Sequence, residues 1–124
     1  MRFLNPVSLE VDQEKINLYA DITDDWNPLH TDPEFAAGTE MKGVIAHGTM
    51  SVNLIWQALT AAFGLETAGR TTLDIRFLRP VRVGDTVTAG GNPDDDDPSL
   101  WRVWVRNQRG EEVIGGTARF RVDS

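Results

Sequence analysis

The most hydrophobic part of the chain is residues 48–63, a stretch that contains no charged side chain. A helix that is apolar nearly all round is typical of a helix buried in a core. Gly64 follows this stretch and suits the cap at a helix C-terminus. We therefore predict one long buried helix here, about 24 Å in length at 1.5 Å per residue.

Beyond residue 70, apolar and polar side chains alternate in several short runs, which indicates half-buried strands. The predicted strands lie at residues 72–77, from a turn at 83–85 through Val87, at 100–106 and at 114–122. Residues 90–98 hold two glycines, two prolines and four consecutive aspartates, so we predict a solvated loop there. Residues 108–110 are predicted to form the hairpin turn before the last strand.

Capping residues organise the first third of the chain. Residues 1–10 are expected to be a short extended segment. Asp12 suits an N-cap, and the apolar residues after it recur at helical spacing, which predicts a helix over residues 13–23. A second N-cap, Asp32, is followed by proline and predicts a helix of about one turn that ends at Gly38.

Residues 24–33 bring three aspartates, an asparagine and a histidine together with two prolines. The residue before a proline avoids the α region, so the preceding helix is predicted to end near Asp25, with His30 just beyond a rigid bend. A carboxylate and an imidazole held side by side can activate water or move a proton near neutral pH. Aspartate, asparagine and proline are also ordinary turn formers, so a purely structural turn remains an alternative.

Composition narrows the function classes. A chain of 124 residues with 40% hydrophobic residues fits one domain, 1–124, with a real core. The net charge of −7 argues against a nucleic-acid partner, and the absence of cysteine excludes disulfides and thiol chemistry. No apolar run is long enough for a membrane span, and the first residues are too few and too polar for a signal peptide, so we expect a cytoplasmic protein.

Residues 25–30, Asp-Trp-Asn-Pro-Leu-His, resemble the Asp-x-Asn-Pro-x-His motif of the MaoC-like, (R)-specific enoyl-CoA hydratase family. Residues 43–48 and 77–85 resemble that family's segments before and after its central helix, in the same order. The resemblance implies an α+β hotdog fold, in which an antiparallel sheet wraps around a long central helix. Two departures are Asp24, where the family often has glycine, and Thr49, where methionine is common.

The resemblance implies reversible hydration of a 2-enoyl thioester, an acyl-CoA, without a further cofactor or metal. Asp25 and His30 are expected to share and activate one water, and Asn27 to orient the pair or the water. The backbone N–H of Gly48 opens the predicted buried helix, where unpaired N–H groups and the positive end of the helix dipole meet. It is therefore expected to hold the thioester oxygen.

Other residues are candidates for contact with the substrate. His47 and Thr49 flank Gly48, although a structural role for His47 is the stronger alternative. Trp56 lies two turns into the helix and either limits the acyl chain or packs in the core. Five basic residues are candidates for the CoA phosphates, with surface ion pairs as the alternative: Lys42, Arg70, Arg76, Arg79 and Arg82.

The sequence leaves three rival functions open. A non-catalytic partner subunit is one, because some MaoC-like chains work in pairs, but the presence of both Asp25 and His30 favours an active chain. A hotdog acyl-CoA thioesterase is the second. A metal bound by His30, Asp32 and a nearby aspartate is the third. The apolar helix, Trp101 and Trp104 further predict a homodimer or larger homo-oligomer.

Overall fold

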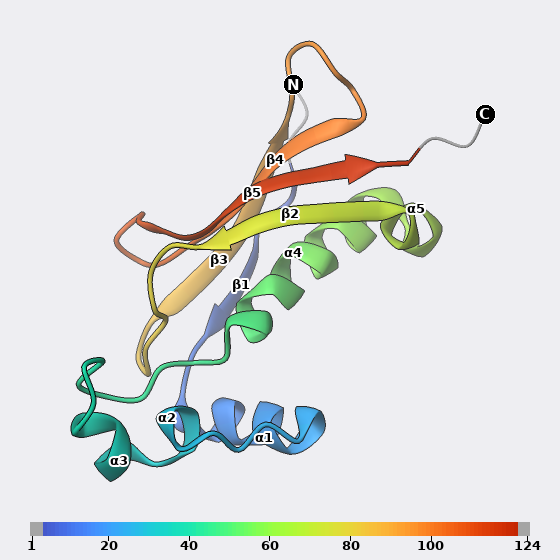
Figure 1. The fold of residues 1–124 in the computed structure, drawn as a ribbon. Helices are drawn as coiled ribbons and strands as arrows, with labels where there is room; N and C mark the ends of the chain where they lie inside the picture. Colours follow the sequence, from blue (N-terminus) through green and yellow to red (C-terminus); the bar gives the residue numbers. More distant parts are fainter. Residues whose placement is uncertain (1–3, 122–124) are drawn as a thin grey trace.

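A computed structural model describes residues 4–121, which form one antiparallel sheet beside a long helix (Figure 1). The strands are β1 Val7–Glu10, β2 Thr71–Phe77, β3 Thr86–Pro93, β4 Leu100–Arg106 and β5 Glu112–Phe120. The helices are α1 Gln13–Thr23, α2 Pro28–Thr31, α3 Pro33–Ala37, α4 Gly48–Phe63 and α5 Leu65–Gly69. The sheet order is β1-β3-β4-β5-β2, so the first two strands of the chain form its two edges.

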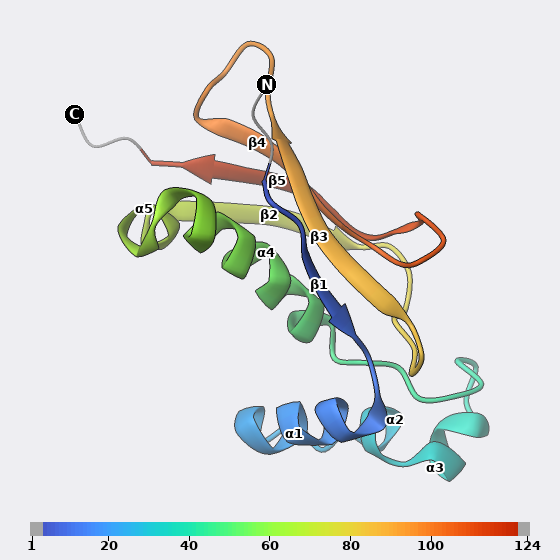
Figure 2. The same ribbon diagram turned by 180° about the vertical axis from the view of Figure 1, so that it is seen from behind.

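The sheet curls around α4, which is the hotdog arrangement. Figure 2, the view from behind, shows β1 and β3 at the front, running obliquely to the helix. Leu54, Ile55 and Leu59 of α4 are buried against the inward side chains of the strands, such as Val87 and Val103. Burial of this apolar surface, at about 25 cal/mol per Å², is the main force that holds the helix to the sheet.

Local capping chemistry explains where the helices begin and end. The Asp12 carboxylate accepts a hydrogen bond from the Lys15 N–H at 2.8 Å, and Asp32 accepts two at the start of α3. The α4 helix ends at Gly64, whose φ of 88° suits glycine. The predicted bounds of α1 and α4 are confirmed, as are the one-turn helix after Asp32 and the strand at residues 100–106.

The predicted loop at residues 90–98 is wrong in its first half, because β3 continues to Pro93. Gly90 pairs with Trp104 and Gly91 with Val103. A Cβ atom at Gly90 would stand 2.9 Å from Nε1 of Trp104, so the missing side chain lets the indole lie across the strand. Packing between strands therefore outweighs the turn preference of the two glycines.

Two expectations about buried surfaces also change. Trp101 is only 4% exposed within its own chain, so it is not available to a second subunit. The α4 helix is buried on one face, whereas Thr49, Asn53 and Gln57 on the opposite face are exposed. The apolar residues of α4 are needed on the face that packs against the sheet. The opposite face is exposed to solvent in the single chain.

The remaining differences lie at the ends of elements and in two short helices. Residues 7–10 of the expected extended segment form β1, while residues 1–3 lie outside the described part of the chain. The last strand runs from Glu112 to Phe120, and Val122 of the prediction also lies outside the described residues. The short helices α2 and α5 were not predicted.

The segment between β1 and α4 forms a separate layer beyond one end of the sheet. In Figure 1, α1, α2 and α3 lie below the sheet, and the chain then returns to the start of α4. Ile45 forms an isolated bridge with Arg82, which ties this return to the turn before β3. Within residues 4–121, no helix combines the length and the apolar composition needed to span a membrane.

Candidate active site

Asp24 ends α1 in the left-handed conformation, with φ of 54°. Aspartate tolerates this region better than most residues, which explains how it can replace glycine here. The left-handed backbone of Asp24 turns the chain out of the helix. The Asp25 N–H still donates a hydrogen bond to the Ala20 carbonyl at 3.0 Å. Asp25 therefore follows directly on a rigid helix end, and its side chain is 52% exposed.

Asn27 starts the short helix that carries His30. Its side-chain oxygen caps α2 by accepting the Leu29 N–H at 3.0 Å, and Pro28 occupies the first helical position. The backbone N–H of Asn27 also donates to the Asp25 carboxylate at 3.3 Å. Asn27 thus helps to position the Asp25 carboxylate through its backbone N–H, and its side chain caps the helix that carries His30.

His30 faces the return segment before α4. Its Nδ1 lies 2.6 Å from the carbonyl oxygen of Ile45. Because a carbonyl oxygen can only accept, this contact assigns the proton of the neutral ring to Nδ1. Nε2 of His30 therefore carries the lone pair and can act as a base.

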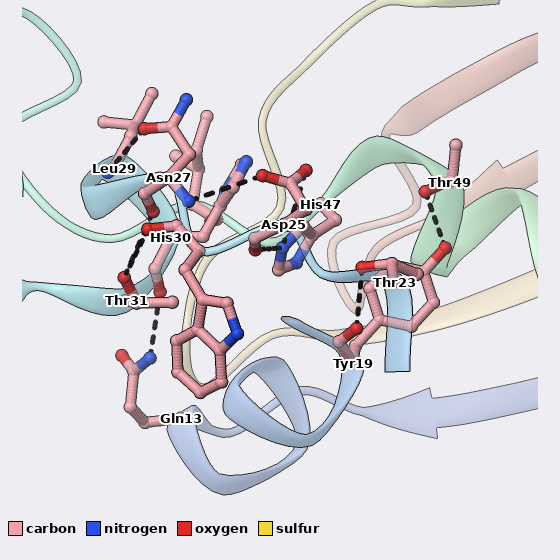
Figure 3. Close-up of polar contacts among 12 residues, drawn as sticks. Gln13, Tyr19, Thr23, Asp25, Asn27, Leu29, His30, Thr31, His47 and Thr49 are labelled. Atoms are coloured by element: carbon pink, nitrogen blue, oxygen red, sulfur yellow. Dashed lines mark hydrogen bonds and ion pairs between the residues drawn. The ribbon is translucent and has the colours of Figure 1, made fainter. Parts of the chain in front are cut away.

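His47 is buried, with 3% of its surface exposed, and stacks on His30 with 4.0 Å between ring centroids. Its Nε2 lies 2.9 Å from the Asp25 carbonyl oxygen and 3.9 Å from the Asp25 carboxylate. Nε2 must donate to that carbonyl, which leaves the lone pair on Nδ1. Nδ1 has no hydrogen-bond partner among residues 4–121. Figure 3 shows the two imidazoles beside the Asp25 side chain.

The ligand atoms of Asp25, His30 and His47 all lie within 4.8 Å of one another, a donor set that a metal ion could use. Imidazole lone pairs lie in the ring plane, and the two rings are stacked with an interplanar angle of 29°. Both lone pairs cannot point at one ion unless a ring turns. The predicted donor Asp32 is not in this cluster, because its carboxylate caps α3.

A cavity of about 560 Å³ opens beside this cluster. Its polar end contains Asp25, His30, His47, Gly48 and Thr49. The rest of the lining is mostly apolar and includes Met41, Ile45, Phe77, Leu78, Val81 and Ile114. A mostly apolar pocket with a few convergent polar groups is typical of a small-molecule site.

Gly48 and Thr49 form the first turn of α4 at the polar end of the cavity. N–H groups in the first turn of a helix have no partner within the helix, and the dipole makes this end positive. The Thr49 hydroxyl is hydrogen-bonded to the Tyr19 hydroxyl at 2.6 Å. Figure 3 shows that this contact joins α1 to the start of α4.

Of the predicted basic residues, Arg79 is the one that lines the cavity within the described chain. Its guanidinium lies 3.8 Å from Glu111. Hydrogen bonds from Asn107 and Arg109, with the nearby charges of Arg79 and Arg109, hold the pKa of Glu111 below its ordinary value. Arg79 therefore faces an ionised carboxylate near neutral pH, yet its side chain stays 57% exposed.

Trp56 is absent from the cavity lining of residues 4–121 and instead packs, partly buried, against the core. Sequence reasoning missed Phe77, Leu78 and Met41 as lining residues. Phe77 and Leu78 belong to the third block of the family resemblance, where a strand ends in two consecutive apolar residues. That interruption of the alternating pattern was the available signal.

Known proteins share this fold and parts of this sequence. The chain is 35% identical to an (R)-specific enoyl-CoA hydratase from Rhodospirillum rubrum over 79 residues, which cover 64% of this chain and 55% of the relative. It is 34% identical to an (R)-specific enoyl-CoA hydratase from Aeromonas caviae, over 60% of this chain and 56% of the relative. The chain thus spans about half the length of the curated relatives that it matches.

Solved structures extend the likeness to nearly the whole chain. The unliganded (R)-hydratase PhaJ1 from Pseudomonas aeruginosa superposes with a TM-score of 0.78 at 28% identity, covering 96% of this chain and 78% of that one. The (R)-hydratase from A. caviae gives 0.77 at 26% identity, with 98% and 95% covered. A family model described as the MaoC like domain matches residues 1–96, more than three quarters of the sequence. This chain therefore belongs to the MaoC-like domain family.

Proposed function

We propose that this protein adds water to a 2-enoyl thioester to give an (R)-3-hydroxyacyl thioester, and catalyses the reverse dehydration. The observation that carries the proposal is the convergence of Asp25 and His30 at the polar end of an apolar cavity. The start of α4 lies at the same end. The two (R)-specific enoyl-CoA hydratases among the relatives support the same class of reaction.

Hydration forms a bond between the water oxygen and C3 of the thioester. The water loses one proton to the Asp25–His30 pair, where the lone pair on Nε2 of His30 makes that ring a suitable acceptor. The electrons of the C2–C3 double bond move toward the thioester oxygen, and the pair returns a proton to C2. Acid–base groups of this kind contribute roughly 10²–10⁴-fold to a rate.

The developing negative charge needs a donor at the thioester oxygen. The Gly48 N–H supplies it in our proposal, at the positive end of α4 and beside the cavity. One preorganised donor of this kind is typically worth about 3–4 kcal/mol. The acyl group would then lie among the apolar lining residues, and Arg79 would meet a phosphate of the CoA carrier.

We also propose that two chains associate. The edge strand β2 ends at Phe77 and is followed by Leu78, and these side chains are 60% and 53% exposed in the single chain. Such large apolar side chains beside an open strand edge favour a partner. A second copy at this edge would extend the sheet and bring new surface to the mouth of the cavity.

An assay with purified protein tests the reaction. Crotonyl-CoA and longer enoyl-CoAs should lose the absorbance of the conjugated double bond, and the product should have R configuration. Asp25→Asn should lower kcat at least 100-fold, as expected for loss of an acid–base group. Asp24→Asn is the matched control, because Asp24 is exposed and asparagine also tolerates its left-handed backbone.

Two outcomes would contradict the proposal. Near-normal turnover by Asp25→Asn would remove Asp25 from the chemistry. Release of free CoA thiol without loss of the double bond would identify a thioesterase instead.

A further inference from the structure

The buried ring of His47 joins parts of the site that are distant in sequence. Its Nε2–H donates to the main-chain carbonyl of Asp25 at 2.9 Å. One face of the ring stacks on His30, and Tyr19 meets it edge-on with 5.0 Å between ring centroids. Figure 3 shows Asp25, His30 and Tyr19 around this ring.

We propose that His47 is a positioning residue, which holds the Asp25 main chain and the His30 ring in their working places; this inference rests on the proposed function. Asp25 needs such support, because it lies in the link between α1 and α2 and half of its side chain is exposed. Apart from the His47 contacts, its carboxylate has one hydrogen bond within residues 4–121, to the nearby Asn27 N–H.

Stability alone does not account for a histidine at this place. His47 occupies the N-cap position of α4, yet its side chain makes no capping hydrogen bond. Serine, asparagine or aspartate would cap the helix better. The buried Nδ1 of His47 also lacks a partner among the described residues, which costs stability. A residue that is costly for the fold and central to the site is expected to serve function.

The surroundings keep the ring from turning. The Tyr19 hydroxyl is hydrogen-bonded to Thr49, so the tyrosine that meets His47 is itself fixed between α1 and α4. His30 is held on the other side by its bond to the Ile45 carbonyl. The ring of His47 is therefore held in one orientation, in contact with both Asp25 and His30.

Four variants separate the possible roles. His47→Gln keeps an amide N–H near the position of Nε2, whereas His47→Asn has the same chemistry but is one methylene too short to reach Asp25. Asparagine is also a favourable N-cap, so that variant should fold. His47→Phe keeps a ring for stacking but has no donor. Val103→Ala, in the buried centre of β4, is a control for loss of stability away from the site.

Kinetics with crotonyl-CoA should split kcat from KM. His47→Phe and His47→Asn should lower kcat about 10- to 100-fold with KM within about 3-fold, since a displacement of about 1 Å can cost 10²-fold. His47→Gln should recover kcat to within about 5-fold of the native enzyme. Val103→Ala should lower the melting temperature and leave kcat unchanged.

Hydrogen exchange without substrate gives a readout that is independent of activity. Amides of residues 24–30 should exchange faster in His47→Phe and His47→Asn than in His47→Gln, with β4 unchanged in all three. A native protein that hydrates no enoyl thioester would refute the proposed function. The difference in amide exchange between the His47 variants would still test whether His47 holds the Asp25 main chain in place.

Either of two results would overturn the role of His47. Equal kcat in the Gln, Asn and Phe variants and the native enzyme would show that the hydrogen bond positions nothing. Equal loss in all three variants, with a raised KM, would show that His47 binds substrate directly.

Discussion

The ring of Phe77 lies against the backbone of Gly48, so that a Cβ atom at position 48 would stand 2.6 Å from Cε1 of Phe77. Carbon atoms attract each other best at about 3.5–4.0 Å, so a methyl group would push the ring away. The ring belongs to the cavity lining and is 60% exposed, so it has room to move. A side chain at position 48 would therefore have to displace the Phe77 ring.

Gly48→Ala should destabilise the protein and lower kcat/KM, because the displaced ring reshapes the cavity next to the proposed oxygen site. In a Phe77→Ala background the same substitution should cost less stability. A double-mutant cycle on the free energy of unfolding should give a coupling of about 0.5 kcal/mol or more. Additive effects would show that the ring imposes no restriction.

His30→Asn should separate fold from chemistry. The asparagine amide can replace Nδ1–H as donor to the Ile45 carbonyl, but it offers no base in place of Nε2. The melting temperature should stay close to native while hydration falls about 10²–10⁴-fold. His30→Ala, which loses both functions, should be less stable by about 1 kcal/mol. Retained turnover in the folded asparagine variant would exclude His30 as the base.

Trp56→Ala should act on stability and not on chain-length preference. Trp56 packs on the core and is partly buried, so its truncation should cost somewhat less than the roughly 3–5 kcal/mol of a fully buried aromatic residue. Activity on crotonyl-CoA and longer enoyl-CoAs should change in proportion. Met41→Ala, which enlarges the cavity itself, is the comparison that should favour longer substrates. A selective gain for long substrates in Trp56→Ala would place the indole beside the acyl chain.

Light scattering should give the mass of at least two chains at micromolar concentration. Leu78→Asp should weaken the assembly, because it puts a charge directly after the exposed edge strand β2. Leu65→Asp is the matched control, since Leu65 is also exposed but lies on α5. A monomer in the native protein would reject the association, and equal effects of the two variants would reject the β2 edge as its site.

Glu112 should make stability depend on pH in acid. Burial raises the pKa of its carboxyl, but hydrogen bonds and charges from Arg102 and Arg106 outweigh burial and leave it below its ordinary value. Its stabilisation is therefore complete above the unfolded pKa of about 4.3 and is lost as pH falls through the lower folded value. Glu112→Gln should lower the free energy of unfolding at pH 7 by up to about 1 kcal/mol.

The difference in the free energy of unfolding between the native protein and Glu112→Gln should shrink as pH falls below about 4.3 and through the lower folded pKa of Glu112. Glu40→Gln is the control, because Glu40 is exposed and forms no ion pair in the described part of the chain. A difference that stays constant down to pH 3 would show that the carboxylate charge is not responsible.

Sequence reasoning predicted the elements whose ends depend on local chemistry. Asp12 and Asp32 cap their helices as expected, and the uncharged stretch ending at Gly64 is α4. The second half of β3 was missed because Gly90 and Gly91 favour turns locally, and only the strand beside them explains their use.

Part of the candidate site could also be predicted, because it is formed by residues that lie close together in the sequence. Asp25 and His30 stand in one short motif, so their proximity follows from the local chain. The stacking of His47 on His30 joins residues 17 positions apart, and the contact of Phe77 with Gly48 joins α4 to β2. Such contacts depend on the path of the whole chain, and no local pattern specifies them.

The strand order also sets a sequence of events during synthesis of the protein. β2 pairs with β5, so a chain still emerging from the ribosome exposes β2 well before its strand partner exists. Ile114, which lines the cavity, also comes from β5, so the cavity is completed late. Until then the apolar face of α4 has only part of its cover. A partly synthesised chain of this protein is therefore expected to be prone to aggregation.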